Sequence, residues 1–238
     1  MQKKTLGIIG GMGPMATADL YRKIVALTDA PNDNAHIHVL IDSNVNIPDR
    51  TAAILTGGAD PLPELTKSAR LLENAGADIL MMPCNTAHYF YDGVCKATPL
   101  PVLHMLRLTV EEIKRRGLKK VGLLATDGTV KTGIYARLFE ENGVPFLTPD
   151  EKGQKAVMDM IYKGVKAGKS AGEYDASAVR AALSRMLALG AEAFVLGCTE
   201  LPLAFEDYRL DYPSVDPTRV LARAAVEAAG YQAKKQGA

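Results

Sequence analysis

An internal repeat with a step of about 115 residues constrains this chain more than any other feature. Two short apolar runs each end in a cysteine, and Cys84 and Cys198 stand 198 − 84 = 114 residues apart. A second pair of runs keeps nearly the same step, because Gly7 and Gly122 are separated by 122 − 7 = 115 residues. This period is far above the roughly 20–50 residues of solenoid repeats. It predicts two similar lobes, and if the lobes face each other, so do their cysteines.

The composition excludes two classes of partner. At 238 residues the chain fits two lobes near the common domain size. Its 28 basic and 27 acidic residues are mixed and give a formal charge of +1, so no basic stripe indicates nucleic acid. No apolar run approaches the length of about 18 residues that a membrane helix needs, and no signal-peptide cleavage pattern comes after the first run. We expect a small-molecule substrate, with neither a nucleic-acid nor a membrane partner.

The three cysteines favour a reducing compartment and do not form a set of metal ligands with their neighbours. Their number is odd and they form no C-x-x-C pair, which fits reduced thiols in the cytoplasm better than a disulfide framework. Cys84 and His88 are spaced four residues apart but supply only two ligands, so we expect no metal site. Cys95 has no counterpart in the repeat and is interpreted as a packing residue.

Apolar runs of four to six residues alternate with segments of helical period, a pattern typical of parallel strands joined by crossover helices. The fold class is therefore α/β, with two pseudo-symmetric lobes, each a parallel sheet flanked by helices. The first lobe covers 1–103 and is joined by a C-terminal helix within 216–230, and the second covers 104–215. We expect strands near 5–10, 37–42, 78–82, 101–103, 120–125, 144–147 and 193–197, and helices near 15–29, 62–75, 86–97, 105–116, 130–142, 150–167, 174–189 and 217–229.

Both repeat-related cysteines occupy a position that suits chemistry. Cys84 and Cys198 are each the first polar residue after a predicted strand and precede residues that can begin a helix. In open parallel sheets ligands bind at the carboxyl ends of strands, and helix N-termini favour the thiolate. The alternative is that each cysteine only fills the core, as many single cysteines do. Their repeat-related placement favours a shared functional role.

The loop 10–16 has a G-x-G-x-x-A pattern that can be interpreted in two ways. It matches a dinucleotide-binding turn, with Asp42 as the ribose acid, but Asp42 lies 42 − 16 = 26 residues beyond Ala16, which is late for the usual interval of about 20. The glycines can equally present backbone N–H groups to a carboxylate. The second-lobe counterpart, 125–132, carries hydroxyl donors instead. Two such loops suit one small anionic substrate between the lobes.

Five motifs follow one another along the chain. They are Gly10-Gly11-Met12-Gly13-Pro14, Ile47-Pro48-Asp49-Arg50-Thr51, Met82-Pro83-Cys84-Asn85-Thr86-Ala87-His88, Gly164-Val165-Lys166-Ala167-Gly168 and Gly197-Cys198-Thr199-Glu200. Together they resemble the aspartate racemase family of the aspartate/glutamate racemase superfamily, from about residue 5 to residue 225. This resemblance implies two pseudo-symmetric α/β lobes with the active site in the cleft between them, a homodimer and a reaction that needs no cofactor. It implies Cys84 and Cys198 as the catalytic pair, and Arg50 and Lys166 as the basic pair for the substrate side-chain carboxylate.

The residue types suit racemisation independently of the resemblance. A base on one face of Cα must take a proton and an acid on the other face must return one, and two thiols can exchange these roles. Without an electron sink, the carbanion must be stabilised by donors at the α-carboxylate. Each candidate donor can instead serve as a helix N-cap. The candidates are Asn85, Thr86 and Thr199, together with the turn that holds Met12 and Gly13, and Thr126.

Two positions depart from the pattern of related glutamate racemases. Those enzymes carry an acid where this chain has Met12, and a histidine where it has Glu200. Glu200 could orient the substrate ammonium or help to deprotonate Cys198. The sequence thus favours an aspartate racemase, with a broad-specificity or glutamate racemase or a maleate-type isomerase as the alternative. From a different class, a non-catalytic module that binds a nucleotide or an amino acid also stays open.

Overall fold

The computed structural model describes residues 3–235, which divide into two compact units. One unit holds residues 3–108 with 218–235, and the other holds 109–217. Within the described residues, no helix combines the length and the apolar character needed to cross a membrane.

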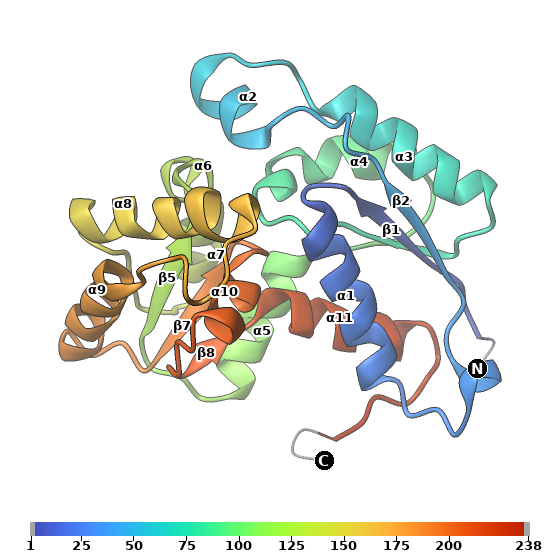
Figure 1. Cartoon of the computed structure of the whole chain (residues 1–238). Coiled ribbons are helices and arrows are strands. Elements are labelled where there is room, and N and C mark those ends of the chain that lie inside the picture. Colours follow the sequence, from blue (N-terminus) through green and yellow to red (C-terminus); the bar gives the residue numbers. More distant parts are fainter. Residues whose placement is uncertain (1–2, 236–238) are drawn as a thin grey trace. The chain divides into compact units, whose positions relative to one another are not determined.

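The first unit is built on a four-stranded parallel sheet with the order β2-β1-β3-β4 (Figure 1). Every residue of its central strand β1 is buried, as expected for a parallel strand that is covered on both faces. Helices and short 3₁₀ turns come after the strands. The elements are β1 (Leu6–Gly10), α1 (Pro14–Leu27), η1 (Asp33–Ala35), β2 (Val39–Ser43), α2 (Arg50–Thr56), α3 (Leu62–Asn74), β3 (Ile79–Met81), η2 (Thr86–Phe90), α4 (Tyr91–Ala97), β4 (Val102–Leu103), α5 (Met105–Arg115) and α11 (Pro217–Ala228), the last two continuing across the unit boundary.

An apolar cluster fixes the helices on this sheet. Helix α3 buries Leu65, Ala69 and Leu72, which recur at helical spacing and form one face. They pack in one cluster with Ile9 of β1 and Leu80 of β3. Burial of each large aliphatic side chain contributes roughly 1.5–3 kcal/mol. Because β1, β2 and β3 pair in parallel, their carboxyl ends lie at one edge of the sheet.

The second unit repeats the topology of the first. Its four-stranded parallel sheet has the order β6-β5-β7-β8, so β5 and β7 correspond to β1 and β3 (Figure 1). Strands β5 and β7 are buried at every residue. The predicted α/β class with two parallel sheets flanked by helices is therefore confirmed. The elements are β5 (Val121–Ala125), α6 (Asp127–Thr132), α7 (Ile134–Glu141), β6 (Phe146–Leu147), α8 (Glu151–Asp159), the π turn η3 (Met160–Gly164), the 3₁₀ turn η4 (Val165–Ala167), α9 (Ser177–Ala188), β7 (Ala193–Gly197), α10 (Leu201–Asp207) and β8 (Ser214–Val215).

Three of the predicted helices are interrupted, and the one expected over 86–97 consists of the 3₁₀ turn η2 followed by α4. The helix expected over 130–142 is divided at Gly133, whose φ of 64° ends α6 in the left-handed region before α7 begins. The helix expected over 150–167 is α-helical only to Asp159 and continues through η3 and η4. Four short elements, η1, α2, α10 and β8, were not predicted.

Candidate functional site

Cys84 lies just beyond β3 in the first unit, at the carboxyl edge of the sheet. The thiol-bearing residue is 6% exposed and packs in the same apolar cluster as Met12. Its backbone N–H donates to the carbonyl of Met82 at 2.9 Å, and its own carbonyl oxygen lies 2.9 Å from Nδ1 of His88. The turn that carries the thiol is thus fixed by hydrogen bonds at both the N–H and the carbonyl of Cys84.

Both ring nitrogens of His88 are engaged. Nδ1 faces the Cys84 carbonyl, and Nε2 accepts the backbone N–H of Met105 at 3.1 Å, which assigns the neutral tautomer with hydrogen on Nδ1. Burial, with His104 nearby, lowers the pKa of His88 to about 3, although the carbonyls of Cys84 and Leu103 act in the opposite direction. An imidazole with both nitrogens occupied has none left for a metal ion. Over residues 3–235, no cluster of three or more metal-binding side chains forms.

The glycines of the β1–α1 loop are required by its packing. Gly11 has φ 88°, and a Cβ there would lie 2.4 Å from the backbone of Asn44. Its N–H donates to the Thr17 hydroxyl at 2.9 Å, which in turn donates to the carbonyl of Gly13. Close approach of two backbone segments explains this glycine without a dinucleotide. The G-x-G-x-x-A pattern therefore carries no separate argument for such a ligand.

Arg50 is the first residue of α2 and is buried, with 8% of the residue exposed. Its Nη1 donates to the carbonyls of Ile47 and Pro48, and its Nη2 donates to that of Met12 at 3.3 Å. The guanidinium therefore ties the loop after β2 to the loop after β1. Its charge is held at the carboxyl edge of the sheet by backbone carbonyls.

The structure brings the predicted first-unit residues to one edge of one sheet. Met12 and Gly13 come after β1, Arg50 after β2, and Cys84 after β3, and these strands are parallel neighbours. The Arg50–Met12 hydrogen bond is direct. Asn85 and Thr86 come next in the chain and are 2% and 6% exposed.

Cys198 lies just beyond β7 in the second unit, at the position equivalent to that of Cys84. It is 8% exposed, and its Sγ–H donates to Oε2 of Glu200 at 2.9 Å. The Thr199 hydroxyl donates to the same oxygen at 3.4 Å. Burial raises the pKa of the Cys198 thiol well above its usual value, and the Glu200 carboxylate raises it further, against a smaller opposing effect of Lys166. The structure thus places a protonated thiol against a carboxylate.

Lys166 completes this cluster from η4. Its Nζ lies 3.8 Å from Oε1 of Glu200 and 4.7 Å from the ring centroid of Tyr162. Tyr162 belongs to the π turn η3, a rare geometry that often occurs at functional sites. Thr199, Glu200 and Lys166 therefore gather around Cys198 as one polar cluster. Lys166 comes from the part of the expected helix 150–167 that is a π turn and a 3₁₀ turn instead of an α-helix.

Thr126 serves as a helix cap. Its hydroxyl accepts the N–H of Thr129 at 3.3 Å at the start of α6. Thr132 donates to the carbonyls of Gly128 and Thr129. The segment expected to be a loop of hydroxyl donors is therefore a short helix that uses these hydroxyls internally, which corrects that expectation.

Two residues of these clusters were missed as site residues. His88 was considered only as a metal ligand, although its i, i+4 spacing from Cys84 on one helical turn was a signal for the contact. Tyr162 had no sequence signal, because its position beside Lys166 depends on the π turn.

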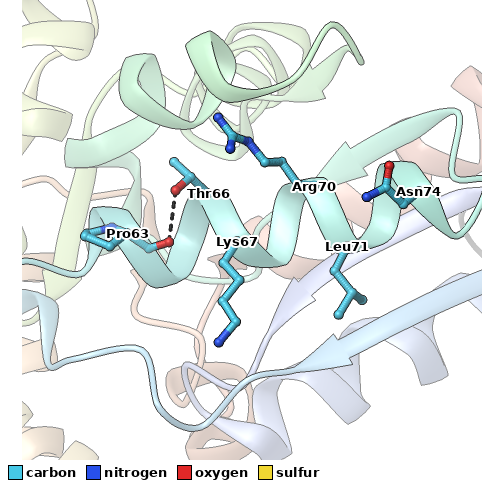
Figure 2. A pocket seen from close by; sticks show the side chains of 6 residues that line it. All are labelled: Pro63, Thr66, Lys67, Arg70, Leu71 and Asn74. Atoms are coloured by element: carbon cyan, nitrogen blue, oxygen red, sulfur yellow. Dashed lines mark hydrogen bonds between the residues drawn. The ribbon is translucent and has the colours of Figure 1, made fainter.

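A hollow of about 490 Å³ lies on α3 (Figure 2). Figure 2 shows that its walls come from this helix alone and that the Thr66 hydroxyl turns back to the carbonyl of Pro63. None of its residues is a predicted site residue. They are Pro63, Thr66, Lys67, Arg70, Leu71 and Asn74.

Comparison with known proteins identifies relatives over almost the whole chain. Residues 9–225 match the family described as Asp/Glu/Hydantoin racemase. The chain is 26% identical to the broad specificity amino-acid racemase RacX of Bacillus subtilis over 234 residues, covering 93% of this chain and 96% of the relative. Among solved structures it resembles Picrophilus torridus aspartate racemase, with 31% identity, a TM-score of 0.85 and coverage of 98% and 97%. It also resembles an aspartate racemase homologue from Pyrococcus horikoshii, with 26% identity, a TM-score of 0.76 and coverage of 95% and 99%.

Proposed function

The chain belongs to the Asp/Glu/hydantoin racemase family, whose amino-acid racemases work without pyridoxal phosphate, and from this premise we propose that it interconverts L- and D-aspartate. In the proposed reaction Cys84 and Cys198 act on opposite faces of the substrate Cα. The observation that carries the proposal is their placement at equivalent positions, beyond the corresponding strands β3 and β7 of two sheets with the same strand order. Both cysteines are buried; the Cys198 thiol donates to Glu200, and the backbone carbonyl of Cys84 is bound by His88.

The proton steps balance with two thiols. One sulfur, as thiolate, forms an S–H bond as the Cα–H bond breaks, and the electron pair passes into the α-carboxylate as an enediolate. The other sulfur gives its proton to the opposite face of Cα and becomes the thiolate. When Cys198 is to act as base, its proton must first pass to Glu200, whose Oε2 already accepts the S–H hydrogen bond.

Donors near the two cysteines would stabilise the developing charge. Asn85 and Thr86 come after Cys84, and Thr199 comes after Cys198, all almost fully buried. Donors fixed before the reaction stabilise an enediolate more than water does, because they need not reorganise. Gly13 is the N-cap residue of α1, so the free amides of the first turn after it are further candidates, and Thr126 caps α6.

The charges of the proposed site residues support an acidic substrate. With both thiols protonated, Arg50 and Lys166 bring two positive charges and Glu200 one negative charge, which leaves one net positive charge. Aspartate carries one net negative charge and complements it. We propose that Arg50 and Lys166 bind the side-chain carboxylate, with Arg50 held in place through its bonds to the carbonyls of Met12, Ile47 and Pro48.

A broader specificity is the second candidate, and the Lys166–Glu200 pair favours it. The ammonium lies 3.8 Å from a carboxylate, so part of its charge is balanced before any substrate binds. The relative from Bacillus subtilis is named as a broad specificity racemase. A maleate-type isomerase or a non-catalytic binding module would need no Cα proton transfer.

Solvent exchange tests the function. The purified protein is incubated in deuterium oxide with L-aspartate, L-glutamate or L-alanine, without added cofactor, and NMR and chiral chromatography follow both enantiomers. We expect D-aspartate that carries deuterium at Cα from the first turnover, and slower reaction of the other two amino acids. Equal rates for all three would favour broad specificity. No exchange with any amino acid would contradict the racemase function.

We also propose a cytoplasmic homodimer. All three cysteines of the sequence lie among the described residues and are free thiols, which suits a reducing compartment. Light scattering coupled to size-exclusion chromatography gives the mass of the assembly, and a mass near the 25.5 kDa of one chain would contradict the dimer.

A further inference from the structure

We propose that His88 is a positioning residue that fixes the Cys84 thiol by holding the turn after β3 to the turn after β4. The inference rests on the proposed function, in which Cys84 transfers a proton at the substrate Cα. His88 does not touch the reacting atoms in this proposal. It acts through the backbone of the residue that does.

The hydrogen bonds of His88 join two neighbouring strand ends. Strands β3 and β4 are paired, with Met81 opposite Leu103. Beyond β3, the Nδ1–H of His88 donates to the carbonyl of Cys84 at 2.9 Å, and beyond β4 its Nε2 accepts from the N–H of Met105 at 3.1 Å. One imidazole therefore bridges the two turns that leave the sheet at this edge.

The Cys84 carbonyl depends on a side chain for this bond. It belongs to the turn before η2, where the first 3₁₀ bond runs from the His88 N–H to the carbonyl of Asn85. The His88 side chain, four residues on, supplies the donor for Cys84. A buried carbonyl deprived of its donor is destabilised, so the turn would shift without the imidazole.

The surroundings of His88 limit its motion. The ring stacks on Tyr91, with centroids 5.9 Å apart, and contacts His104, with centroids 5.0 Å apart. His104 accepts the backbone N–H of Arg107 through Nδ1 at 3.3 Å. The residue His88 is 6% exposed, and its depressed pKa keeps the ring neutral, which the acceptor role of Nε2 requires.

Two substitutions separate the two bonds. In His88→Asn the side-chain amide stands where Nδ1 stood, so it can donate to the Cys84 carbonyl but cannot reach Met105. In His88→Gln the amide extends to the place of Nε2, so it can accept from Met105 but no longer donates to Cys84. If His88 serves to position Cys84, Asn restores function better than Gln does. If it serves only to cap α5, Gln restores function at least as well.

The experiment measures racemisation and thiol reactivity in His88→Asn, His88→Gln and His88→Ala. For His88→Ala we expect kcat for L-aspartate to fall about tenfold to hundredfold with little change in KM, because misplacement of a reacting group by about 1 Å has an effect of this size. His88→Asn should retain most of kcat, and His88→Gln should resemble His88→Ala. Tyr89→Ala, which changes a half-exposed neighbour in η2, is the control and should behave as wild type.

Iodoacetamide labelling gives a second readout that does not depend on turnover. Peptide mass spectrometry follows the labelling of Cys84 and uses Cys198 of the same molecule as the internal reference. We expect the Cys84:Cys198 ratio to change in the Ala and Gln variants and to stay near wild type in the Asn variant. A His88→Gln variant that matches or exceeds His88→Asn in both readouts would overturn the proposal. If the wild type racemises no amino acid, the proposed function fails, while the labelling ratios still decide the role of His88.

Discussion

The thiol of Cys198 donates a hydrogen bond to the carboxylate of Glu200, with Sγ and Oε2 2.9 Å apart. The two cysteines therefore have different partners, since the carbonyl of Cys84 is bound by an imidazole while the thiol of Cys198 faces an anion. A carboxylate at this distance stabilises the S–H form and can also accept its proton.

Replacement of Glu200 tests this contact. The Glu200→Gln variant keeps the shape and removes the charge, so the pKa of the Cys198 thiol should fall and its alkylation by iodoacetamide should begin at lower pH. Loss of the proton acceptor should lower kcat/KM for aspartate about tenfold to hundredfold, as expected for a charge-assisted hydrogen bond. Labelling of Cys84, measured in the same samples, should not change. An unshifted pH profile of Cys198 would mean that the carboxylate does not govern this thiol.

The two-thiol reaction predicts equal dependence on both cysteines. Cys84→Ser and Cys198→Ser each replace a thiol by a much poorer base, so racemisation of aspartate should fall by a factor of about 10²–10⁴. Cys95→Ser should be close to wild type. Chiral chromatography gives the rates and circular dichroism checks folding. Substantial racemisation by either folded single variant of the pair would leave that cysteine as a packing residue.

The basic pair predicts a change of specificity. Arg50→Ala and Lys166→Ala should each reduce kcat/KM for aspartate by about tenfold or more, with a smaller effect on alanine, because a contact with the side-chain carboxylate is lost. Arg50→Ala should also lower the melting temperature by several degrees, since three backbone carbonyls lose a donor. The more exposed Lys166 should show no such loss. Equal losses of kcat/KM for aspartate and alanine would show that neither residue recognises the substrate side chain.

The histidine cluster predicts loss of stability in acid. Burial lowers the pKa of His88 to about 3, and burial with Arg107 lowers that of His104 to about 4, from an ordinary value near 6.5. At pH values between the lowered pKa values and 6.5, the histidines of the unfolded chain bind protons that those of the folded chain do not. The free energy of unfolding is therefore unaffected above pH 6.5 and falls as the pH drops toward 4. Fully buried His88 contributes up to about 1.4 kcal/mol per pH unit, and the more exposed His104 contributes less.

Urea unfolding at pH values from about 4.5 to about 7.5 measures this slope, and His88→Asn is the matched control. The variant should show a shallower pH dependence because it lacks the buried titrating group. Identical slopes for wild type and His88→Asn would contradict the assignment.

The elements that the sequence predicted are those with long apolar patterns. Strands β1, β5 and β7 are buried along their whole length, so their apolar runs were unbroken. Helix α2 buries only Arg50 and has no apolar face to detect, although Asp49 accepts the N–H of Ala52 as its cap. Strand β8 has two residues, which is too short for any period to show.

In the candidate site too, some features follow from a sequence pattern and others do not. The two cysteines were found because the repeat relates them, and their burial at strand ends could be expected from the apolar runs before them. The contacts of Glu200 with Cys198 and of Arg50 with Met12 depend on side-chain geometry in three dimensions. Sequence spacing carries no information on such geometry, and for that reason the contact of His88 was missed.

The π turn Met160–Gly164 sets the helical phase of the segment after it, which carries Lys166. A π turn holds one residue more than an α turn, and each residue of a helix advances the side-chain direction by about 100°. Relative to an uninterrupted α-helix, the extra residue therefore shifts the side-chain direction of the residues that follow by about that angle. It is in this altered phase that the Lys166 ammonium lies over Tyr162 and near Glu200. Deleting one residue from the turn would shorten the chain by a single position, yet it would redirect the Lys166 side chain away from the carboxylate.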